Sequence, residues 1–298
     1  MNINEQHVQT LATSIEMLTY SVKGDILVAG GDSCVWTAKS VEVFSFKERK
    51  WFEIASMENG HSWASSFIYK DNLFVVGGFN CKSMETLNVK KLPLTWRKFP
   101  TELPYVYWSH QTVVCNQQIF HIGGLIKNKG PSDLISEIKI TGTTSYILKE
   151  LCRMPEPRFD HGAVVVDDKV LIFGGRGKDH EALSSVLKFD PMTLTFKEMP
   201  PLPHPLTDMA TVQWRDQVVL LGGSDEGRKA LNSVIMYDSN TGKITVLPSM
   251  LEKRQWCCAV ITGDTIVVMG GKSGNLTILN QWSVLKWESV LHGHIFLQ

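Results

Sequence analysis

The chain has 298 residues, of which 43% are hydrophobic and 20% are charged. These fractions are close to those of globular proteins and exclude a disordered or fibrous chain. Thirty Lys and Arg residues balance thirty Asp and Glu residues, so the formal net charge is zero. Proteins that hold nucleic acid or anionic membrane usually have a basic excess, and we therefore expect neither as a partner.

The sequence contains no obvious targeting or membrane segment. No apolar run reaches the roughly 18 residues of a membrane-spanning helix, and residues 1–10 are too polar for a secretory signal. Six cysteines are scattered along the chain: Cys34, Cys81, Cys115, Cys152, Cys257 and Cys258. In a long chain without a signal peptide, such spacing favours free buried thiols over a disulfide framework. We expect a cytoplasmic protein.

Gly-Gly pairs divide the chain into six similar units. The pairs begin at Gly30, Gly77, Gly123, Gly174, Gly222 and Gly270, at intervals of 47, 46, 51, 48 and 48 residues. Almost all of the four residues before each pair are apolar, and most are β-branched or large: 26–29, 73–76, 119–122, 170–173, 218–221 and 266–269. Short apolar runs that end at glycine predict strands buried on both faces.

The residues around each apolar run predict three further strands. A polar turn precedes every run, at 23–25, 70–72, 116–118, 167–169, 215–217 and 262–264, and another apolar arm precedes the turn. This pattern predicts a hairpin. A third strand after the glycines often ends in an aromatic residue, as at Phe44, Phe189 and Tyr237. A fourth carries a bulky residue near Trp51, Trp96, Tyr146, Phe196, Ile244 and Trp287.

Each unit is therefore predicted to be a four-stranded antiparallel meander. One meander cannot bury both of its faces, whereas six packed around an axis can, which predicts an all-β, six-bladed β-propeller. We expect one domain over residues 1–298, with repeats at approximately 12–57, 58–103, 104–154, 155–202, 203–250 and 251–291.

The combination of apolar quartet, Gly-Gly, aromatic-Asp and tryptophan resembles the kelch repeat over roughly residues 12–291. Repeat 3 departs from it with a longer insertion at 125–134, and with Tyr146 where tryptophan is usual. Repeat 6 has a shortened third strand. Two closures of the ring remain open. Leu279-Asn280 followed by Trp287 would give repeat 6 its own outer strand, or residues 3–9 would supply that strand.

Motifs that would indicate catalysis fail on spacing or context. Residues 270–273 lack the first glycine of a phosphate-binding loop, and 174–177 lack one glycine of a dinucleotide fingerprint. Cys257 and Cys258 are adjacent in a strand and would point to opposite faces, with one in the core and the other partly exposed. His292 and His294 have no obvious third ligand nearby. We predict no catalytic residues, no metal and no cofactor, and we find no signature of the kelch-type enzymes.

Geometry predicts the binding face. In a meander, the loop that leads into the first strand and the loop that leaves the second emerge on one face, near the axis. Counting from each Gly-Gly pair selects candidate partner-binding residues: Asp32, Trp63, Phe79, Trp108, Ser109, Phe159, Asp160, Arg176, Asp208, Ser224, Trp256 and Lys272. Tryptophan and arginine are frequent in binding hot spots.

Among the cations, Arg176 and Lys272 are expected to face the ligand. The resemblance implies that Arg158 and Arg254, which precede these loops, are structural instead. Because Arg176 is predicted in a loop, its replacement by alanine is expected to weaken binding with little loss of stability. Acidic Asp160 and Asp208 make the predicted pocket mixed in sign.

Resemblance to the kelch-like proteins implies a non-catalytic interaction module. Their propellers act as substrate receptors of cullin-type ubiquitin ligases, and a separate BTB domain, not present in this sequence, recruits the ligase. We expect a protein or short-peptide ligand with an apolar anchor and at least one acidic residue. The alternatives are a kelch-type enzyme that uses the same central pocket, or an actin-binding propeller.

Overall fold

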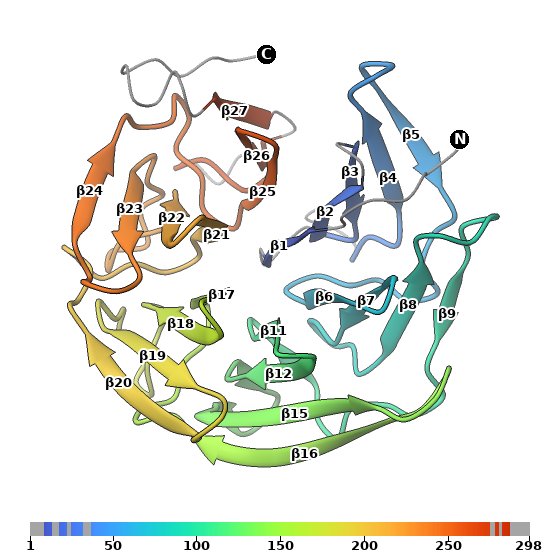
Figure 1. The fold of residues 1–298 in the computed structure, drawn as a ribbon, viewed down its shortest axis with the longest axis horizontal. Coiled ribbons are helices and arrows are strands. Elements are labelled where there is room, and N and C mark those ends of the chain that lie inside the picture. Colours follow the sequence, from blue (N-terminus) through green and yellow to red (C-terminus); the bar gives the residue numbers. More distant parts are fainter. Residues whose placement is uncertain are drawn as a thin grey trace.

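The computed structural model describes residues 9–13, 18–22, 25–31, 37–274, 278–279 and 282–286, and all regular elements in these ranges are β-strands. The strands form antiparallel sheets arranged around a central axis, as in a β-propeller (Figure 1). No helix occurs in the described ranges, and hence none that could cross a membrane. The all-β propeller predicted from the repeats is confirmed.

Six sheets correspond to the six predicted repeats, and we number them as blades 1 to 6. Blade 1 contains β2 (Leu18–Val22), β3 (Asp25–Ala29), β4 (Val41–Ser45) and β5 (Lys50–Ile54). Blade 2 contains β6 (Ser65–Tyr69), β7 (Asn72–Val76), β8 (Met84–Asn88) and β9 (Trp96–Lys98). Blade 3 contains β11 (Gln111–Cys115), β12 (Gln118–Ile122), β15 (Leu134–Ile140) and β16 (Tyr146–Arg153).

The remaining blades continue the same order. Blade 4 contains β17 (Gly162–Val166), β18 (Lys169–Phe173), β19 (Val186–Asp190) and β20 (Thr195–Met199). Blade 5 contains β21 (Ala210–Trp214), β22 (Gln217–Leu221), β23 (Val234–Asp238) and β24 (Ile244–Leu247). Blade 6 contains β25 (Cys258–Thr262), β26 (Thr265–Met269) and β27 (Trp282–Lys286).

The local signals of the sequence correspond to defined features of the blades. The β6–β7 turn consists of Lys70 and Asp71, both with positive φ (46° and 61°), which suits the twist of a tight hairpin. Bulky residues on the third and fourth strands lie directly opposite each other, as in the pair Phe189 and Phe196. These two rings stack with their centroids 5.0 Å apart.

The apolar quartets are buried on both faces because each blade lies between two others. In β7, Leu73 and Val75 pack toward blade 1, while Phe74 and Val76 pack toward blade 3. Alternating side chains of a strand point to opposite faces, so a continuous apolar run serves both interfaces. The core cluster that contains Ile26 joins blade 1 to blades 5 and 6 and so links the two ends of the ring.

The Gly-Gly pairs bring neighbouring blades into backbone contact. The N–H of Gly78 in blade 2 donates to the carbonyl of Tyr107 in blade 3 at 2.8 Å. Gly78 has φ of +119°, and a Cβ there would lie 2.6 Å from the carbonyl oxygen of Ser62. The positive φ and the close approach both require glycine.

Near the ends of the chain, the sequence interpretation needs correction. The third strand of blade 6 is β27, which begins at Trp282 and so lies after Leu279. The parallel with Leu87-Asn88, which end the third strand of blade 2, had placed this strand earlier. Trp287 and residues 3–8 lie outside the described residues. Gln9 belongs to β1 (Gln9–Thr13), which pairs with β2 and therefore does not extend an outer edge.

β1 is an additional strand that the repeats did not predict. It lies near the axis in Figure 1 and close to β6, β17, β21 and β25, the first strands of four other blades. Blade 1 is thereby extended to five strands on its axial side. The innermost layer is crowded on every side, which also explains why Cys257 and Cys258 are both buried and neither is partly exposed.

The insertion of repeat 3 forms a small sheet of its own. β13 (Leu125–Ile126) and β14 (Gly130–Pro131) make a hairpin that pairs with β10 (Tyr107–Trp108). Lys127 donates to the side chain of Asn80 in blade 2 at 2.9 Å. The insertion thus adds a structured wall to the face where the loops of blades 2 and 3 meet.

Candidate functional site

In blades 2 to 6, the two predicted loops of each blade meet on one face. The residue three positions before the first strand pairs with the residue after Gly-Gly in short antiparallel bridges, such as Phe159 with Arg176 and Gln255 with Lys272. In blade 3 the same pairing joins Trp108 and Leu125. The backbone of blades 3 to 6 therefore fixes where these side chains emerge.

A chain of backbone hydrogen bonds connects equivalent loop residues of five blades. Each N–H donates to the carbonyl of the preceding blade: Ser109 to Trp63 (2.9 Å), Asp160 to Ser109 (3.2 Å), Asp208 to Asp160 (3.0 Å) and Trp256 to Asp208 (3.0 Å). All five residues have φ between 52° and 60°. This left-handed conformation is uncommon for residues other than glycine, and the bonded neighbours hold it in place. We call these five residues the backbone belt.

A cavity of about 480 Å³ opens at the belt. Eight of the predicted partner-binding residues line it: Trp63, Trp108, Ser109, Phe159, Asp160, Arg176, Asp208 and Trp256. Phe79, Ser224 and Lys272 lie beside this set without lining the cavity, and Asp32 lies outside the described residues. The sequence analysis did not select Leu125, Arg228, Gln255 and Gly274, which also line the cavity. The offsets that selected Trp108 and Arg176 also give Gln255 and Leu125, which were not chosen as partner-binding residues, whereas Arg228 and Gly274 lie in loops of variable length.

Aromatic rings form one wall of the cavity. Phe79 packs edge-on against Trp63 at 5.0 Å and against Trp108 at 5.8 Å between ring centroids, and it remains 39% exposed. On the other side, the ammonium group of Lys272 lies 5.1 Å from the centre of the Trp256 ring. This cation–π contact orients the Trp256 ring and Lys272 together.

The two acidic residues have different environments. The carboxylate of Asp208 accepts hydrogen bonds from Ser224 Oγ (2.6 Å), Thr207 Oγ1 (2.7 Å) and Trp256 Nε1 (2.8 Å). Ser224 is therefore engaged beneath the cavity and does not face a ligand. Burial, together with the nearby charge of Asp208, raises the pKa of Asp160 well above its usual value.

The structure corrects the role expected for Arg176. Its side chain is almost fully buried, with the residue only 5% exposed, and it donates to His180 O at 3.2 Å and to Thr207 Oγ1 at 3.4 Å. Its Nε also lies 3.9 Å from a carboxylate oxygen of Asp160. Arg176 is thus part of the cavity wall, while Arg228, in the loop after β22, is the exposed arginine at the cavity.

Behind the belt, buried side chains fix the loops to the Gly-Gly pairs. Arg158 Nη1 donates to Gly174 O at 3.0 Å, and Arg254 Nη1 donates to Gly270 O at 2.9 Å. His61 occupies the same position in blade 2, with Nδ1 2.7 Å from Gly77 O. The structural role that the family resemblance implied for the two arginines agrees with these contacts.

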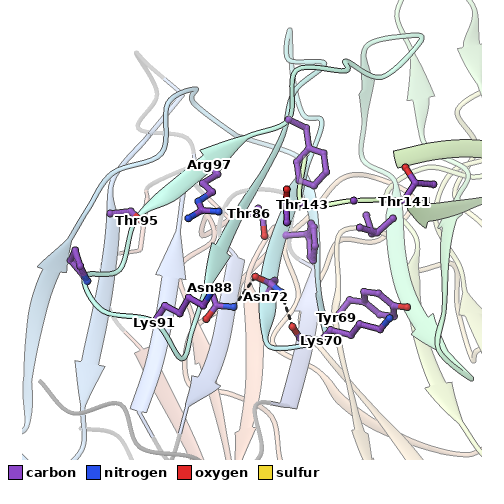
Figure 2. A pocket seen from close by; sticks show the side chains of 15 residues that line it. Tyr69, Lys70, Asn72, Thr86, Asn88, Lys91, Thr95, Arg97, Thr141 and Thr143 are labelled. Atoms are coloured by element: carbon purple, nitrogen blue, oxygen red, sulfur yellow. Dashed lines mark hydrogen bonds between the residues drawn. The ribbon is translucent and has the colours of Figure 1, made fainter. Parts of the chain in front are cut away.

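A second cavity of about 430 Å³ lies between blades 2 and 3, lined by residues from the β6–β7 turn to the β15–β16 turn and away from the predicted residues. Figure 2 shows its side chains, with Asn88 bonded to Asn72, which in turn donates to the carbonyl of Lys70. Lys70, Lys91 and Arg97 line it, and no carboxylate does so among the described residues. We call it the outer cavity.

The described residues contain no group of three or more His, Cys, Asp or Glu side chains arranged to hold a metal ion. His110, His121 and His161 do lie close together in the interior, where the rings of His110 and His121 stack at 4.5 Å between centroids. Their recurrence in the sequence reflects the repeat, since His110 and His161 occupy equivalent positions before their first strands.

Comparison with known proteins gives two findings. The family described as the KLHDC2/KLHL20/DRC7 Kelch-repeats domain matches residues 109–291, which is more than half of the chain. Kelch-like protein 35 of Mus musculus is 26% identical over 224 aligned residues, which cover 61% of this chain and 38% of the relative. The matched region is therefore well under half the length of that protein.

Proposed function

This chain belongs to the KLHDC2/KLHL20/DRC7 kelch-repeat domain family, and from that premise we propose that it is a non-catalytic protein-interaction module that binds a peptide segment of a partner in the central cavity. The observation that supports this most is the convergence of Trp63, Trp108, Phe159 and Trp256 on one cavity from four blades. Aromatic residues in partly enclosed sites contribute a large share of binding energy in protein complexes.

The lining suggests the chemistry of the peptide. An apolar or aromatic anchor fits against Trp63, Trp108 and Phe159, and an acidic residue fits near Arg228 and Lys272 at the mouth. The buried acids Asp160 and Asp208 disfavour a strongly acidic ligand. A volume of about 480 Å³ is in the range of small-ligand sites, so we expect it to hold a few residues of an extended segment.

Resemblance to kelch-like proteins supports a finer proposal about the partner. In this view the module recognises substrates for a cullin-type ubiquitin ligase, which a BTB domain outside the sequence described here would recruit, and it acts in the cytoplasm. The similarity to Kelch-like protein 35 is the support for this assignment. Cosedimentation with filamentous actin and assays for turnover would reveal the two alternative classes, an actin-binding propeller and an enzyme.

Selection from a library of random displayed peptides tests the central cavity without a known partner. We expect the selected peptides to share an aromatic or large apolar residue and an acidic residue. Trp63→Ala is expected to weaken their binding by about 2 kcal/mol, roughly thirtyfold in Kd. Arg97→Ala in the outer cavity is the matched control and should leave Kd unchanged.

The opposite pattern would contradict the proposal. Peptides that bind Trp63→Ala and Trp108→Ala as well as they bind the unmodified chain do not use the central cavity. If Arg97→Ala alone abolishes binding, the outer cavity is the peptide site. Circular dichroism of each variant separates loss of binding from loss of fold.

A further inference from the structure

A cysteine, a histidine and a glutamate meet in blade 2 behind the rim of the central cavity. His61 lies in the loop before β6, Cys81 in the loop after β7, and Glu85 in β8. His61 Nε2 is 3.1 Å from Glu85 Oε1 and 3.5 Å from Ser83 Oγ, and Ser83 Oγ is 3.0 Å from Cys81 Sγ. We call Cys81, His61, Glu85 and Ser83 the thiol cluster.

The contacts of His61 indicate that its ring is positively charged. Nδ1 faces the carbonyl of Gly77, which can only accept a hydrogen bond, so Nδ1 carries a proton. Nε2 faces the carboxylate of Glu85, and a second proton on Nε2 satisfies that acceptor as well. Burial lowers the pKa of His61, but the hydrogen bonds with Cys81 and Glu85 outweigh burial and raise it to about 9.

Glu85 is held as a carboxylate by several donors. The backbone N–H groups of Glu58 and Asn59 donate to its two oxygens at 2.7 and 2.8 Å, and the Asn59 side chain adds a third bond at 3.1 Å. These contacts and His61 outweigh the effect of burial and lower the pKa of Glu85. A fixed carboxylate orients the imidazolium, as the third member of a nucleophile–histidine–acid constellation does.

Cys81 differs from the other cysteines of the described part of the chain. Burial opposes its ionisation, but the hydrogen bond and the charge of His61 lower the pKa of its thiol. Burial instead raises the pKa of Cys115 and of Cys257 to about 11. Cys81 is also 9% exposed, whereas Cys257 and Cys258 have no exposed surface. Cys152 is more exposed than Cys81, but burial raises the pKa of its thiol.

We propose that Cys81 is a modification site at which the thiol cluster activates the sulfur toward hydrogen peroxide. The small exposed area of Cys81 admits a reagent of this size more readily than a bulky thiol or disulfide. Reactive cysteines in proteins are those held as thiolates beside a cation and in partial contact with solvent.

The reaction is a two-electron oxidation of the sulfur. The Cys81 thiolate attacks one oxygen of the peroxide, an S–O bond forms and the O–O bond breaks. The departing hydroxide takes the Nε2 proton of His61 and leaves as water, so the peroxide is reduced and the sulfur becomes a sulfenic acid. His61 is left neutral, which removes its attraction to Glu85.

This change would loosen the loops behind the cavity rim. The N–H of Phe79 donates to Ser62 O at 2.8 Å, next to His61, and the Phe79 ring packs against Trp63. Oxidation of Cys81 is therefore expected to increase amide hydrogen exchange in residues 61–63 and 77–83. This readout needs no peptide ligand and is independent of the proposed binding function.

The proposal is tested by treating the native full-length chain with peroxide, removing the peroxide, and then denaturing the chain in dimedone, which traps the sulfenic acids already formed. Peptide mass spectrometry measures the adduct at each cysteine. Cys152, which is more exposed than Cys81 and whose pKa is raised by burial, is the control for exposure, and Cys115, Cys257 and Cys258 are the buried controls. We expect Cys81 to be oxidised at least about tenfold faster than these four. Equal rates for Cys81 and Cys152, or no adduct at Cys81, would overturn the proposal.

Variants test the part played by the cluster. His61→Gln retains a donor for Gly77 O but has no positive charge, and we expect it to lower the labelling rate of Cys81 by about tenfold. Circular dichroism monitors its fold. A folded His61→Gln chain that labels as fast as the unmodified chain refutes activation by His61. If the variant does not fold, the comparison among the native cysteines decides the proposal.

Discussion

Two arginines at the central cavity have roles that their positions in the sequence do not distinguish. Arg228 is exposed at the cavity, whereas Arg176 is buried and bonded to Thr207 and His180. We predict that Arg228→Ala weakens binding of the selected peptides by about 1 kcal/mol and leaves the free energy of unfolding nearly unchanged. Fluorescence polarisation and urea denaturation measure the two quantities.

Arg176→Ala should lower the free energy of unfolding, which Arg228→Ala leaves nearly unchanged. Without Arg176, the Asp160 carboxyl loses a nearby positive charge in a buried site, and Thr207 loses a donor. We predict a loss of about 1–3 kcal/mol in unfolding free energy. A fully stable Arg176→Ala chain would restore the simpler interpretation of the sequence, in which this residue only faces the ligand.

The buried histidines give the chain an acid-sensitive stability. Burial lowers the pKa of His121 to about 4 and that of His161 to about 3. In the unfolded chain both would titrate near about 6.5, so the unfolded state takes up protons first as the pH falls. Stability is therefore unaffected above about pH 6.5 and is lost progressively below it.

His121→Phe keeps a ring beside Tyr107 and cannot take up a proton. We predict that the variant loses less stability than the unmodified chain between pH 7 and pH 5, by on the order of 2 kcal/mol. Urea denaturation at a series of pH values measures this difference.

His61 has the opposite effect on the pH dependence of stability. Its pKa is raised to about 9, so its stabilising contribution is complete below about pH 6.5 and is lost as the pH rises toward 9.

At the level of the elements, the Gly-Gly segments make the junctions between blades. Gly78 has both a positive φ and a carbonyl 2.6 Å from the position of a Cβ, whereas Gly263, in the β25–β26 turn, has φ of +57° and no atom within 4 Å. We predict that Gly78→Ala costs about 3 kcal/mol of unfolding free energy and Gly263→Ala about 1 kcal/mol. Similar losses for the two variants would show that the close approach of Gly78 to the carbonyl of Ser62, in the loop before β6, is unimportant.

The strands could be predicted where a polar turn lies between two apolar runs. The β6–β7 and β17–β18 hairpins follow from polar turns between apolar runs, because such a pattern has few alternatives when both faces are buried. β1 was missed because it belongs to no repeat, and its position depends on a long-range pairing with β2. The third strand of blade 6 was predicted too early in the chain. The comparison of Leu279-Asn280 with Leu87-Asn88 does not give the length of the loop before that strand.

For the whole molecule, each blade shares its core with its neighbours. Separate clusters join blades 1 and 2, 2 and 3, 3 and 4, and 4 and 5, and one cluster joins blades 5, 6 and 1. We predict a single cooperative transition in urea, with coincident curves from tryptophan fluorescence and far-ultraviolet circular dichroism. Two separated transitions would mean that part of the ring folds independently.

The sequence predicts where the candidate site lies better than it predicts the contacts and exposure of the side chains in it. Rotational symmetry brings residues of equal offset to one mouth, which is why Trp63, Trp108 and Trp256 were found together. Symmetry does not predict which side chains bond to each other, as Asp208 does with Ser224 and Trp256, because those contacts depend on the differences between repeats. The exposure of a long side chain such as Arg228 depends on the conformation of its loop.

In the backbone belt, main-chain hydrogen bonds hold the loops of the face together, and the side chains of the belt residues form its surface. Its hydrogen bonds use only main-chain atoms, and its five positions carry tryptophan twice, aspartate twice and serine once. The same main-chain arrangement therefore accepts large, small, neutral and charged side chains. Recognition at this face could diverge by exchange of single side chains while the architecture stays constant, so chains with the same belt could acquire unrelated ligands over short evolutionary distances.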